Sequence, residues 1–286
     1  MSNKKKELVC FGEVLWDIYP EGKKLGGAPF NVAAHLQKLG ANSSIISRVG
    51  NDNNGSEIRA AISAQNIDLA YIQIDDDFAT GVVKVRLDNE GKPTYTIESP
   101  AAWDHIDVNA ANTQLVENAD AFIFGSLACR SAKSRKSLFD LASLSTYNIC
   151  DLNIRLDFYD LTLIDRLLHI THLLKINDDE AALLCEVLIC SEPDLYPILH
   201  KKYGIKTIVQ TKGDKGAEAS EKNSVVKVAA TNIKVVDTVG AGDAFFAAFL
   251  HTYLQNQDLR SALGAGCKLG AYVATQHGAI PNHPKI

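Results

Sequence analysis

The stretch Asp237-Thr-Val-Gly-Ala-Gly-Asp243 runs directly into the apolar segment Ala244-Phe-Phe-Ala-Ala-Phe-Leu250. The glycines and the alanine leave backbone N–H groups uncovered at a predicted helix N-terminus, where the helix dipole also favours negative charge. A carboxylate at Asp243 would repel a bound phosphate, unless it serves to take a proton from an attacking hydroxyl group. The alternative is an ordinary aspartate near a helix start, with the glycines forming a tight turn.

Outward from this stretch, short apolar strands alternate with helical segments along most of the chain. We expect strands near residues 8–12, 43–49, 121–124, 148–150, 173–176 and 206–210. We expect helices near residues 31–39, 56–64, 131–144, 159–169, 178–187, 193–203, 242–255 and 258–276. Such alternation predicts right-handed crossovers and an α/β fold with a mostly parallel sheet.

One region departs from this alternation. Residues 79–87 and 92–99 are predicted strands joined by a turn-rich segment, and residues 71–74 add another strand. We expect a small antiparallel β lid, formed by about residues 15–25 and 70–100; a decorative hairpin is the alternative. The whole chain, residues 1–286, is then predicted to be a single domain with this lid.

Composition narrows the class of protein. Hydrophobic residues make up 46% and charged residues 22% of the 286 positions, an ordinary balance for a globular protein. The net charge of −5 argues against a nucleic-acid partner. The six cysteines include no Cys-x-x-Cys pair, and no uncharged segment reaches the length of a membrane span. We therefore expect a cytoplasmic enzyme that binds neither nucleic acid nor membrane.

Two common nucleotide-binding motifs are absent. The sequence has no Gly-x-x-x-x-Gly-Lys-[Ser/Thr], which excludes a Walker-type phosphate loop. The segment Gly240-Ala-Gly242 lacks the third glycine of a dinucleotide fingerprint, and no suitably placed acidic residue follows it. A dinucleotide-dependent dehydrogenase is therefore disfavoured.

A second glycine cluster, Gly26-Gly-Ala-Pro-Phe-Asn31, precedes the first predicted helix. The paired glycines Gly26 and Gly27 let a ligand approach the backbone, and Asn31 offers a donor and an acceptor to a hydroxyl group. Asp17 comes after the first strand, at the sheet edge where open α/β sheets bind ligands, and is placed to accept from two sugar hydroxyls. A helix cap for Asn31 and a turn residue for Asp17 are the alternatives.

These clusters together resemble the ribokinase-like carbohydrate kinases, the PfkB family, whose two signatures match residues 26–33 and 237–243. Further similar elements are Ser47–Gly55, Asn177-Asp-Asp-Glu180 and Thr211-Lys-Gly-Asp-Lys-Gly216. The resemblance covers nearly the whole chain. It implies a three-layer α/β/α domain with a small β lid, and an ATP-dependent sugar kinase.

The resemblance also implies roles for single residues. Asp243 would be the base that deprotonates a primary hydroxyl of the sugar, and Gly240, Ala241 and Gly242 would form the anion hole for the transferred phosphoryl group. Asn177 and Glu180 lie three residues apart at a helix start, and therefore on one face, which suits water-mediated binding of Mg²⁺. As an isolated pair they would be a polar helix end.

The nucleotide side follows in the same way. Thr211, Gly213 and Gly216 would lie against ATP, with adenine near the last two helices and Gly278. The monovalent-cation site of the family, which takes potassium, maps onto Asp237 and the Val239 carbonyl.

Within the family the chain is most similar to bacterial fructokinases, through residues 11–20, 26–31 and 100–104. Asp151-Leu-Asn-Ile-Arg155 resembles an Asp-Pro-Asn-x-Arg element, although Leu152 replaces the proline. We hypothesise that Arg155 approaches the sugar or the transferred phosphate; a surface arginine is the alternative.

Two other functions stay open. A 2-keto-3-deoxygluconate kinase would need a positive partner for the sugar carboxylate, which Arg86 or Arg155 could supply. A sugar-binding protein that has lost catalysis is the alternative from another class.

The alternation of Val83, Val85 and Leu87 with charged residues also permits a homodimer through the lid.

Overall fold

The computed structural model describes residues 5–20, 22–87, 93–156, 158–222 and 224–282. Within them, a central sheet of nine strands has the order β13-β12-β11-β10-β9-β8-β1-β4-β5. Seven strands are parallel: β1 (Glu7–Phe11), β4 (Asn42–Gly50), β5 (Ile72–Asp75), β8 (Ala121–Gly125), β9 (Asn148–Asp151), β10 (Leu173–Asn177) and β11 (Thr207–Thr211). The edge strands β12 (Ala217–Glu221) and β13 (Ser224–Val228) run antiparallel to their neighbours.

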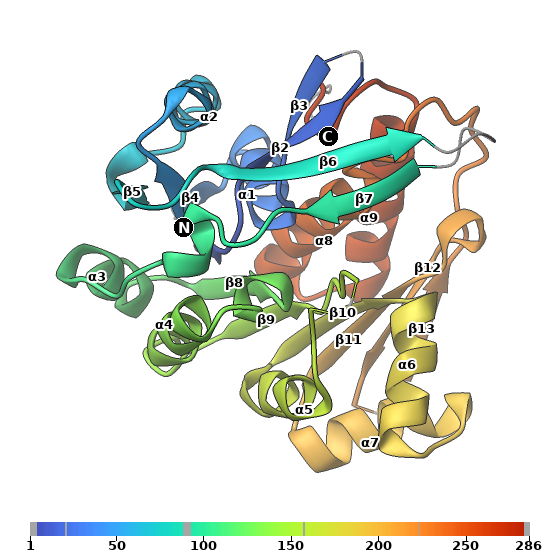
Figure 1. Cartoon of the computed structure of the whole chain (residues 1–286). Coiled ribbons are helices and arrows are strands. Elements are labelled where there is room, and N and C mark those ends of the chain that lie inside the picture. The colour runs from blue at the N-terminus through green and yellow to red at the C-terminus, as the bar shows by residue number, and fades with distance from the viewer. Residues whose placement is uncertain (1–4, 21, 88–92, 157, 223, 283–286) are drawn as a thin grey trace.

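Helices cover both faces of this sheet (Figure 1). One face carries α1 (Ala28–Lys38), α2 (Asn53–Ala64), α8 (Ala241–Asn256) and α9 (Leu259–Ala274). The other carries α3 (Ala110–Glu117), α4 (Ala132–Ala142), α5 (Leu161–Ile170), α6 (Asp178–Leu188) and α7 (Glu192–Tyr203). The expected α/β/α layers are therefore confirmed.

Alternating side chains of the strands build two hydrophobic cores. In β1, Leu8 and Cys10 belong to the core beneath α1 and α8, whereas Val9 and Phe11 belong to the core beneath α4 and α5. Because both faces are covered, strands such as β1 and β8 are almost wholly apolar, as buried parallel strands usually are. Helix starts are fixed by capping side chains at Asp52, Ser131, Asp160 and Asp258, each of which accepts a backbone N–H of the first turn.

The small sheet has the order β3-β2-β6-β7, with β2 (Leu15–Tyr19), β3 (Gly22–Gly26), β6 (Gly81–Leu87) and β7 (Pro93–Ile97). The sequence predicted an antiparallel sheet, and this prediction was wrong. The sheet is mixed, because β2 and β6 pair in parallel. The cause is the long connection between them, which passes through α1, β4, α2 and β5 before the chain returns.

The predicted lid segment 70–100 is divided by the structure. Its first strand, β5, pairs with β4 and extends the central sheet, so only β6 and β7 belong to the small sheet. Within that sheet Val83 and Val85 are buried in the single chain, 6% and 4% exposed, and pack with Leu15. The predicted turn at residues 88–91 and the side chain of Leu87 lie outside the described residues.

Across the described part of the chain, no helix combines the length and the apolar character that crossing a lipid bilayer requires.

Candidate active site

A glycine turn begins helix α8. Gly240 has φ 76°, in the left-handed region, and a Cβ atom there would lie 2.6 Å from the Cα atom of Ala279. Only glycine fits this close contact without strain. The N–H of Ala241 donates to the Thr238 carbonyl at 3.2 Å, whereas the N–H of Gly242 has no acceptor among the described residues. Gly242 is also exposed, so this amide is available to a ligand.

Asp243 lies in the first turn of α8 and contacts the first turn of α1. The side-chain amide of Asn31 donates to its Oδ2 atom at 2.7 Å. Burial raises the pKa of Asp243, and the hydrogen bond from Asn31 and the charges of Lys175 and Arg155 oppose that rise. Asn31 is only 4% exposed, and its Oδ1 atom has no partner in the described chain. A buried acceptor beside the carboxylate is thus free for a ligand hydroxyl.

The predicted sugar-binding residues meet where β2 and β3 return to α1. The sequence placed Asp17 at the end of the first strand. In the structure it lies on β2, in the small sheet. A Cβ atom on Gly26 would lie 2.5 Å from its Oδ2 atom, so the carboxylate covers this glycine. Gly27, at φ 110°, would likewise collide with the carbonyl of Glu13. Burial raises the pKa of Asp17 to about 6, against the opposing charges of Arg155 and Lys24.

Glu13 is a further acidic residue of this site that sequence reasoning missed. It is buried, and its Oε1 atom accepts the N–H of Ala28 at 3.2 Å, which fixes the start of α1. Burial raises the pKa of Glu13 to about 7. The available signal was an acidic residue directly after a buried strand, among apolar neighbours.

Arg155 follows β9 and is exposed. Its charge lowers the pKa values of Glu13, Asp17 and Asp243 alike, which means that the guanidinium lies near all three carboxyl groups. The structure therefore brings Arg155 together with the predicted base and the predicted sugar-binding aspartate.

Asn177 and Glu180 form a reciprocal cap at the start of α6. The Oδ1 atom of Asn177 accepts the N–H of Glu180 at 2.8 Å, and Oε2 of Glu180 accepts the N–H of Asn177 at 2.9 Å. The other carboxylate oxygen of Glu180 accepts the N–H of Ile154 at 2.9 Å. Both carboxylate oxygens of Glu180 are thus engaged with backbone N–H groups, and the side chain is buried. No group of three metal-ligating side chains occurs in the described ranges.

Thr211 ends β11 directly opposite Asn177 in the parallel register. Gly213, at φ 56°, and Gly216, at φ 97°, shape the turn that leads into β12, and a Cβ atom on Gly216 would lie 2.1 Å from the Val228 carbonyl oxygen. These three residues lie at the same sheet edge as Asn177 and two strands from Asp151. No described contact joins the two glycines to Asp243.

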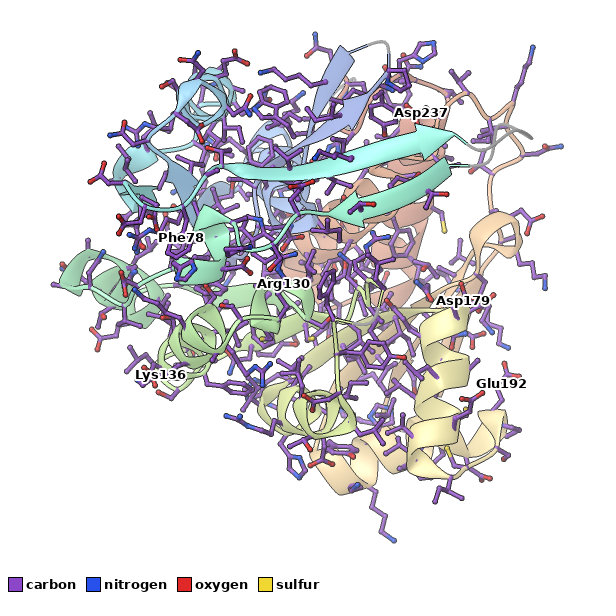
Figure 2. All side chains as sticks on the ribbon, viewed as in Figure 1. Phe78, Arg130, Lys136, Asp179, Glu192 and Asp237 are labelled. Atoms are coloured by element: carbon purple, nitrogen blue, oxygen red, sulfur yellow. The ribbon has the colours of Figure 1, made fainter. Side chains whose placement is uncertain are left out.

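Asp237 connects the turn before α8 with the segment after α9, at Gly278, and with the small sheet, at Lys24. Its Oδ1 atom accepts the N–H of Val239 at 3.0 Å, and Oδ2 accepts the N–H of Gly278 at 3.1 Å and the Nζ of Lys24 at 3.3 Å. Burial acts to raise the pKa of Asp237, but these partners lower it overall. Figure 2 shows Asp237 beside the strands of the small sheet and Asp179 at the start of α6.

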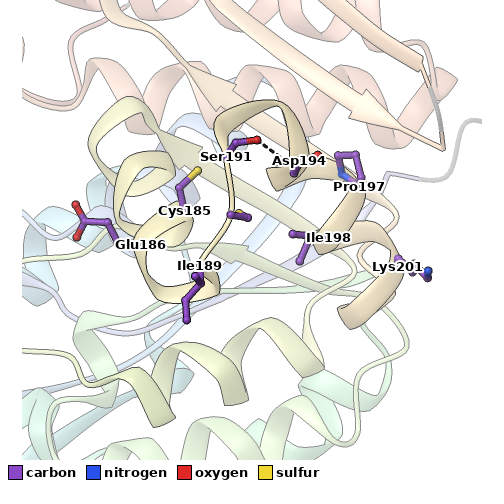
Figure 3. Close-up of a pocket in the computed structure, with 9 residues that line it drawn as sticks. Cys185, Glu186, Ile189, Ser191, Asp194, Pro197, Ile198 and Lys201 are labelled. Atoms are coloured by element: carbon purple, nitrogen blue, oxygen red, sulfur yellow. Dashed lines mark hydrogen bonds between the residues drawn. The ribbon is translucent and has the colours of Figure 1, made fainter.

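A surface hollow of about 700 Å³ lies elsewhere, between α6 and α7 (Figure 3). Its lining includes Cys185, Ile189, Asp194 and Ile198, and none of the predicted site residues. The chemistry-bearing side chains thus gather at the opposite end of α6, around its first turn and that of α8.

Comparisons with known proteins agree with this arrangement. Residues 5–286 match the pfkB family carbohydrate kinases. The chain is 32% identical to a putative sugar kinase of Pyrococcus horikoshii over 278 residues, covering 95% of this chain and 87% of the relative. It is 30% identical to a fructokinase of Salmonella typhimurium over 296 residues, covering 96% and 94%.

Two solved structures are similar over the same extent, each covering 96% of this chain and 94% of the other. The Pyrococcus horikoshii sugar kinase in complex with ATP gives a TM-score of 0.82 at 26% identity. A fructokinase from Vibrio cholerae, bound to fructose, ADP and a calcium ion, gives 0.83 at 25% identity.

Proposed function

This chain belongs to the pfkB family of carbohydrate kinases, and we propose that it transfers the γ-phosphoryl group of ATP to a primary hydroxyl of D-fructose. That it is an ATP-dependent carbohydrate kinase, similar to fructokinases, follows from the family; the sugar is the proposal. The observation that carries it is the contact of Asp243 with Asn31 at the glycine-preceded start of α8. A proton acceptor and the unpaired amide of Gly242 meet there, beside a buried acceptor for a sugar hydroxyl.

In this proposal Asp243 takes the proton of the attacking hydroxyl. The sugar oxygen forms a bond to the γ-phosphorus, and the bond from phosphorus to the bridging oxygen breaks, so that ADP leaves with the electron pair. The raised pKa of Asp243 makes it a better proton acceptor than an exposed aspartate. Of the proposed anion-hole residues Gly240, Ala241 and Gly242, Ala241 gives its N–H to Thr238, whereas Gly242 is exposed and its N–H has no acceptor in the described chain.

The sugar would lie between the small sheet and α1. Asp17 would accept from its hydroxyls, the Oδ1 atom of Asn31 would accept another, and Gly26 and Gly27 would let the ring approach the backbone. Arg155 would face the sugar or the transferred phosphate. The strands β2, β3, β6 and β7 are then a lid, which excludes water from the phosphoryl group during transfer.

The nucleotide would lie along the adjoining strand ends. Its proposed contacts are Asn177, Thr211, Gly213, Gly216 and Gly278. Glu180 would hold Mg²⁺ through water, and the ion would neutralise part of the phosphate charge. Asp237 and the Val239 carbonyl are the proposed potassium site; a fructokinase double mutant of Vibrio cholerae has been solved with fructose, ADP and a potassium ion.

Local charge favours a neutral sugar over a sugar acid. The charge of Arg155 already acts on three carboxyl groups, those of Glu13, Asp17 and Asp243. The carboxylate of 2-keto-3-deoxygluconate would be repelled by them, and Arg155 alone would not compensate. The side chain of Arg86, the other candidate partner, lies outside the described residues.

A coupled assay of ADP release with fructose, ribose and 2-keto-3-deoxygluconate tests the substrate. We expect the highest kcat/KM with fructose. A preference for the sugar acid would replace the proposed substrate, and sugar binding without turnover would contradict the proposed chemistry.

A dimer through the lid, which the strand pattern permits, could not use Val83 and Val85, because both are buried within the chain. It would need exposed lid side chains such as Tyr95. Light scattering after size-exclusion chromatography decides between monomer and dimer.

A further inference from the structure

A buried ion pair lies directly beneath the start of α8. Lys175 on β10 and Asp151 on β9 are neighbours in the parallel register, and Nζ of Lys175 donates to Oδ1 and Oδ2 of Asp151 at 2.9 and 3.1 Å. The residues are only 6% and 5% exposed. Neither residue has a part in the function proposed above.

The ammonium group of Lys175 borders the open space in front of Gly242. A Cβ atom placed on Gly242 would meet Nζ at 4.0 Å and, apart from its two chain neighbours and the backbone of its own helix, no other described atom within that distance. Gly242 is exposed, so this space is open to a ligand. It is the space that the anion-hole proposal gives to the transferred phosphoryl group.

Lys175 keeps its positive charge in this position. Burial by itself would lower the pKa of the ammonium group, but the charges of Asp151, Glu180 and Asp243 raise it above its usual value. An ammonium group has three N–H donors, and in the described chain only Asp151 accepts from Nζ. At least one donor therefore has no protein partner.

An ion pair of this kind is costly to bury. Taking both charges out of water is often not repaid by their attraction, and apolar replacements of buried pairs are frequently neutral or stabilising. Stability alone therefore gives no reason for a lysine in the otherwise apolar strand Leu173-Leu-Lys-Ile176.

We propose that Lys175 is a further catalytic residue, whose ammonium group donates a hydrogen bond to a peripheral oxygen of the γ-phosphoryl group during transfer. Asp151 is its positioning residue. Lys175 keeps its proton throughout, since the hydroxyl proton passes to Asp243 and the electron pair of the broken P–O bond leaves with ADP. This inference rests on the proposed site at α8 and adds a charged side chain to its backbone donors.

Replacement of Lys175 tests the inference. We expect Lys175→Met to lower kcat by about 10²–10³-fold, the usual effect of removing one preorganised donor, with KM for the sugar changed little. Lys175→Met leaves Asp151 buried without its partner, so Lys175→Met/Asp151→Leu is made as well to restore a neutral interior. The double variant should unfold near the temperature of the parent and still show the low kcat.

A second readout separates catalysis from structure. With sugar and magnesium present, aluminium fluoride should tighten ADP binding to the parent, because it mimics the phosphoryl group in flight. In both Lys175 variants this gain should disappear, while the affinity for ADP alone stays within a few-fold. The matched control is Lys133→Met, which removes a lysine paired with Asp107 at 2.9 Å on α4, away from the site, and should leave both quantities unchanged.

The outcomes are distinct. If the double variant keeps a kcat within three-fold of the parent, or keeps the gain from aluminium fluoride, Lys175 is not catalytic although the kinase proposal stands. If the parent itself phosphorylates no sugar, the proposed function fails, and the catalytic role of Lys175 fails with it.

Discussion

Burial raises the pKa of each carboxyl group that faces the proposed sugar site. The pKa of Asp17 is raised to about 6 and that of Glu13 to about 7, and that of Asp243 is raised as well. Positive charge from Arg155 opposes each of these shifts. Because the pKa values of Asp17 and Glu13 lie close to neutrality, the charge of the site changes over an ordinary range of pH.

The raised pKa of Asp17 predicts that fructose binding depends on pH. Both of its carboxyl oxygens accept hydrogen bonds from two sugar hydroxyls only when the group is ionised, because protonation turns one oxygen into a donor, so fructose binding should weaken as the pH falls through about 6. If binding requires the ionised form, Kd should rise roughly ten-fold between pH 7 and pH 5, as measured by calorimetry without nucleotide. Asp17→Asn should bind more weakly and show a flatter dependence. An unchanged pH dependence in this variant would remove Asp17 from the sugar site.

The pairing of Lys24 with Asp237 predicts how removal of Lys24 changes the activation of the enzyme by potassium. The Nζ of Lys24 lies 3.3 Å from Oδ2 of Asp237, so a lid residue supplies part of the positive charge that a monovalent cation would supply. In Lys24→Met the carboxylate loses this partner and should attract potassium more strongly. We expect half-maximal activation at a lower potassium concentration, measured from kcat in potassium titrations with tetramethylammonium as the balancing ion. An unchanged half-activating concentration would separate Lys24 from the cation site.

At the scale of elements, two glycines at the start of α8 should respond differently to the same change. Gly240→Ala places a side chain at positive φ and 2.6 Å from Ala279, so it should lower the free energy of unfolding by at least about 1 kcal/mol. Gly242→Ala meets only the end of Lys175, at 4.0 Å, and should leave stability within about 0.5 kcal/mol.

Gly242→Ala, which should hardly affect stability, should nevertheless lower activity. A methyl group there enters the space of the phosphoryl group, so kcat should fall although the fold is kept. Urea unfolding and steady-state kinetics on both variants measure the contrast. A fully active Gly242→Ala variant would place the phosphoryl group elsewhere.

The sequence predicted most of the regular elements, and the structure confirms them at β1, β4, β8 to β11 and the helices from α4 to α9, as well as α1 and α2. These segments carry their own apolar periodicity. Residues 15–25 were assigned to the lid without separate strands, which the structure places at β2 and β3, and the strands β12 and β13 and helix α3 were not predicted. In β3, Gly22-Lys-Lys-Leu-Gly26, little favours a strand except its pairing with β2, and β12 is rich in alanine and glutamate. Tertiary pairing, not local preference, makes them strands.

The same distinction explains what was missed in the site. A charged side chain in a buried strand was visible at Lys175, but its partner Asp151 and its approach to Gly242 depend on strand order. Asn31 and Asp243 are 212 residues apart, and their contact exists only because α1 packs against α8. The rule that parallel strands present ligand sites at their carboxyl ends predicted the edge of the sheet, but not these pairs.

For the whole molecule, the small sheet is only partly independent of the main domain, because Trp16 of β2 and Leu25 of β3 pack against the core beneath α1 and α8. Leu15, Val83 and Val85 form a small apolar cluster of their own, apart from the two cores of the main sheet. The parallel pairing of β2 with β6 joins the two strand pairs of this sheet. We propose that the sheet therefore closes over the sugar as one unit.

A change inside the lid should therefore affect binding more than stability. Val85→Ala should raise KM for fructose several-fold with a small change of Tm. As a comparison, Leu141→Ala in the core beneath α4 should cost ~2–5 kcal/mol of stability and leave KM unchanged in the protein that remains folded. Thermal unfolding and steady-state kinetics give both quantities. If Val85→Ala lowered Tm as much as Leu141→Ala and left KM alone, the lid would not act on the sugar.

The measurement that bears most directly on the account is the turnover of Asp243→Asn with ATP and fructose, alongside fructose binding by the same variant. Asparagine keeps the size of the side chain but cannot accept the proton, so kcat should fall by at least ~10²-fold while Kd for fructose changes little. Wild-type turnover in this variant, in protein that binds fructose normally, would show that proton removal occurs elsewhere and would contradict the proposed active site.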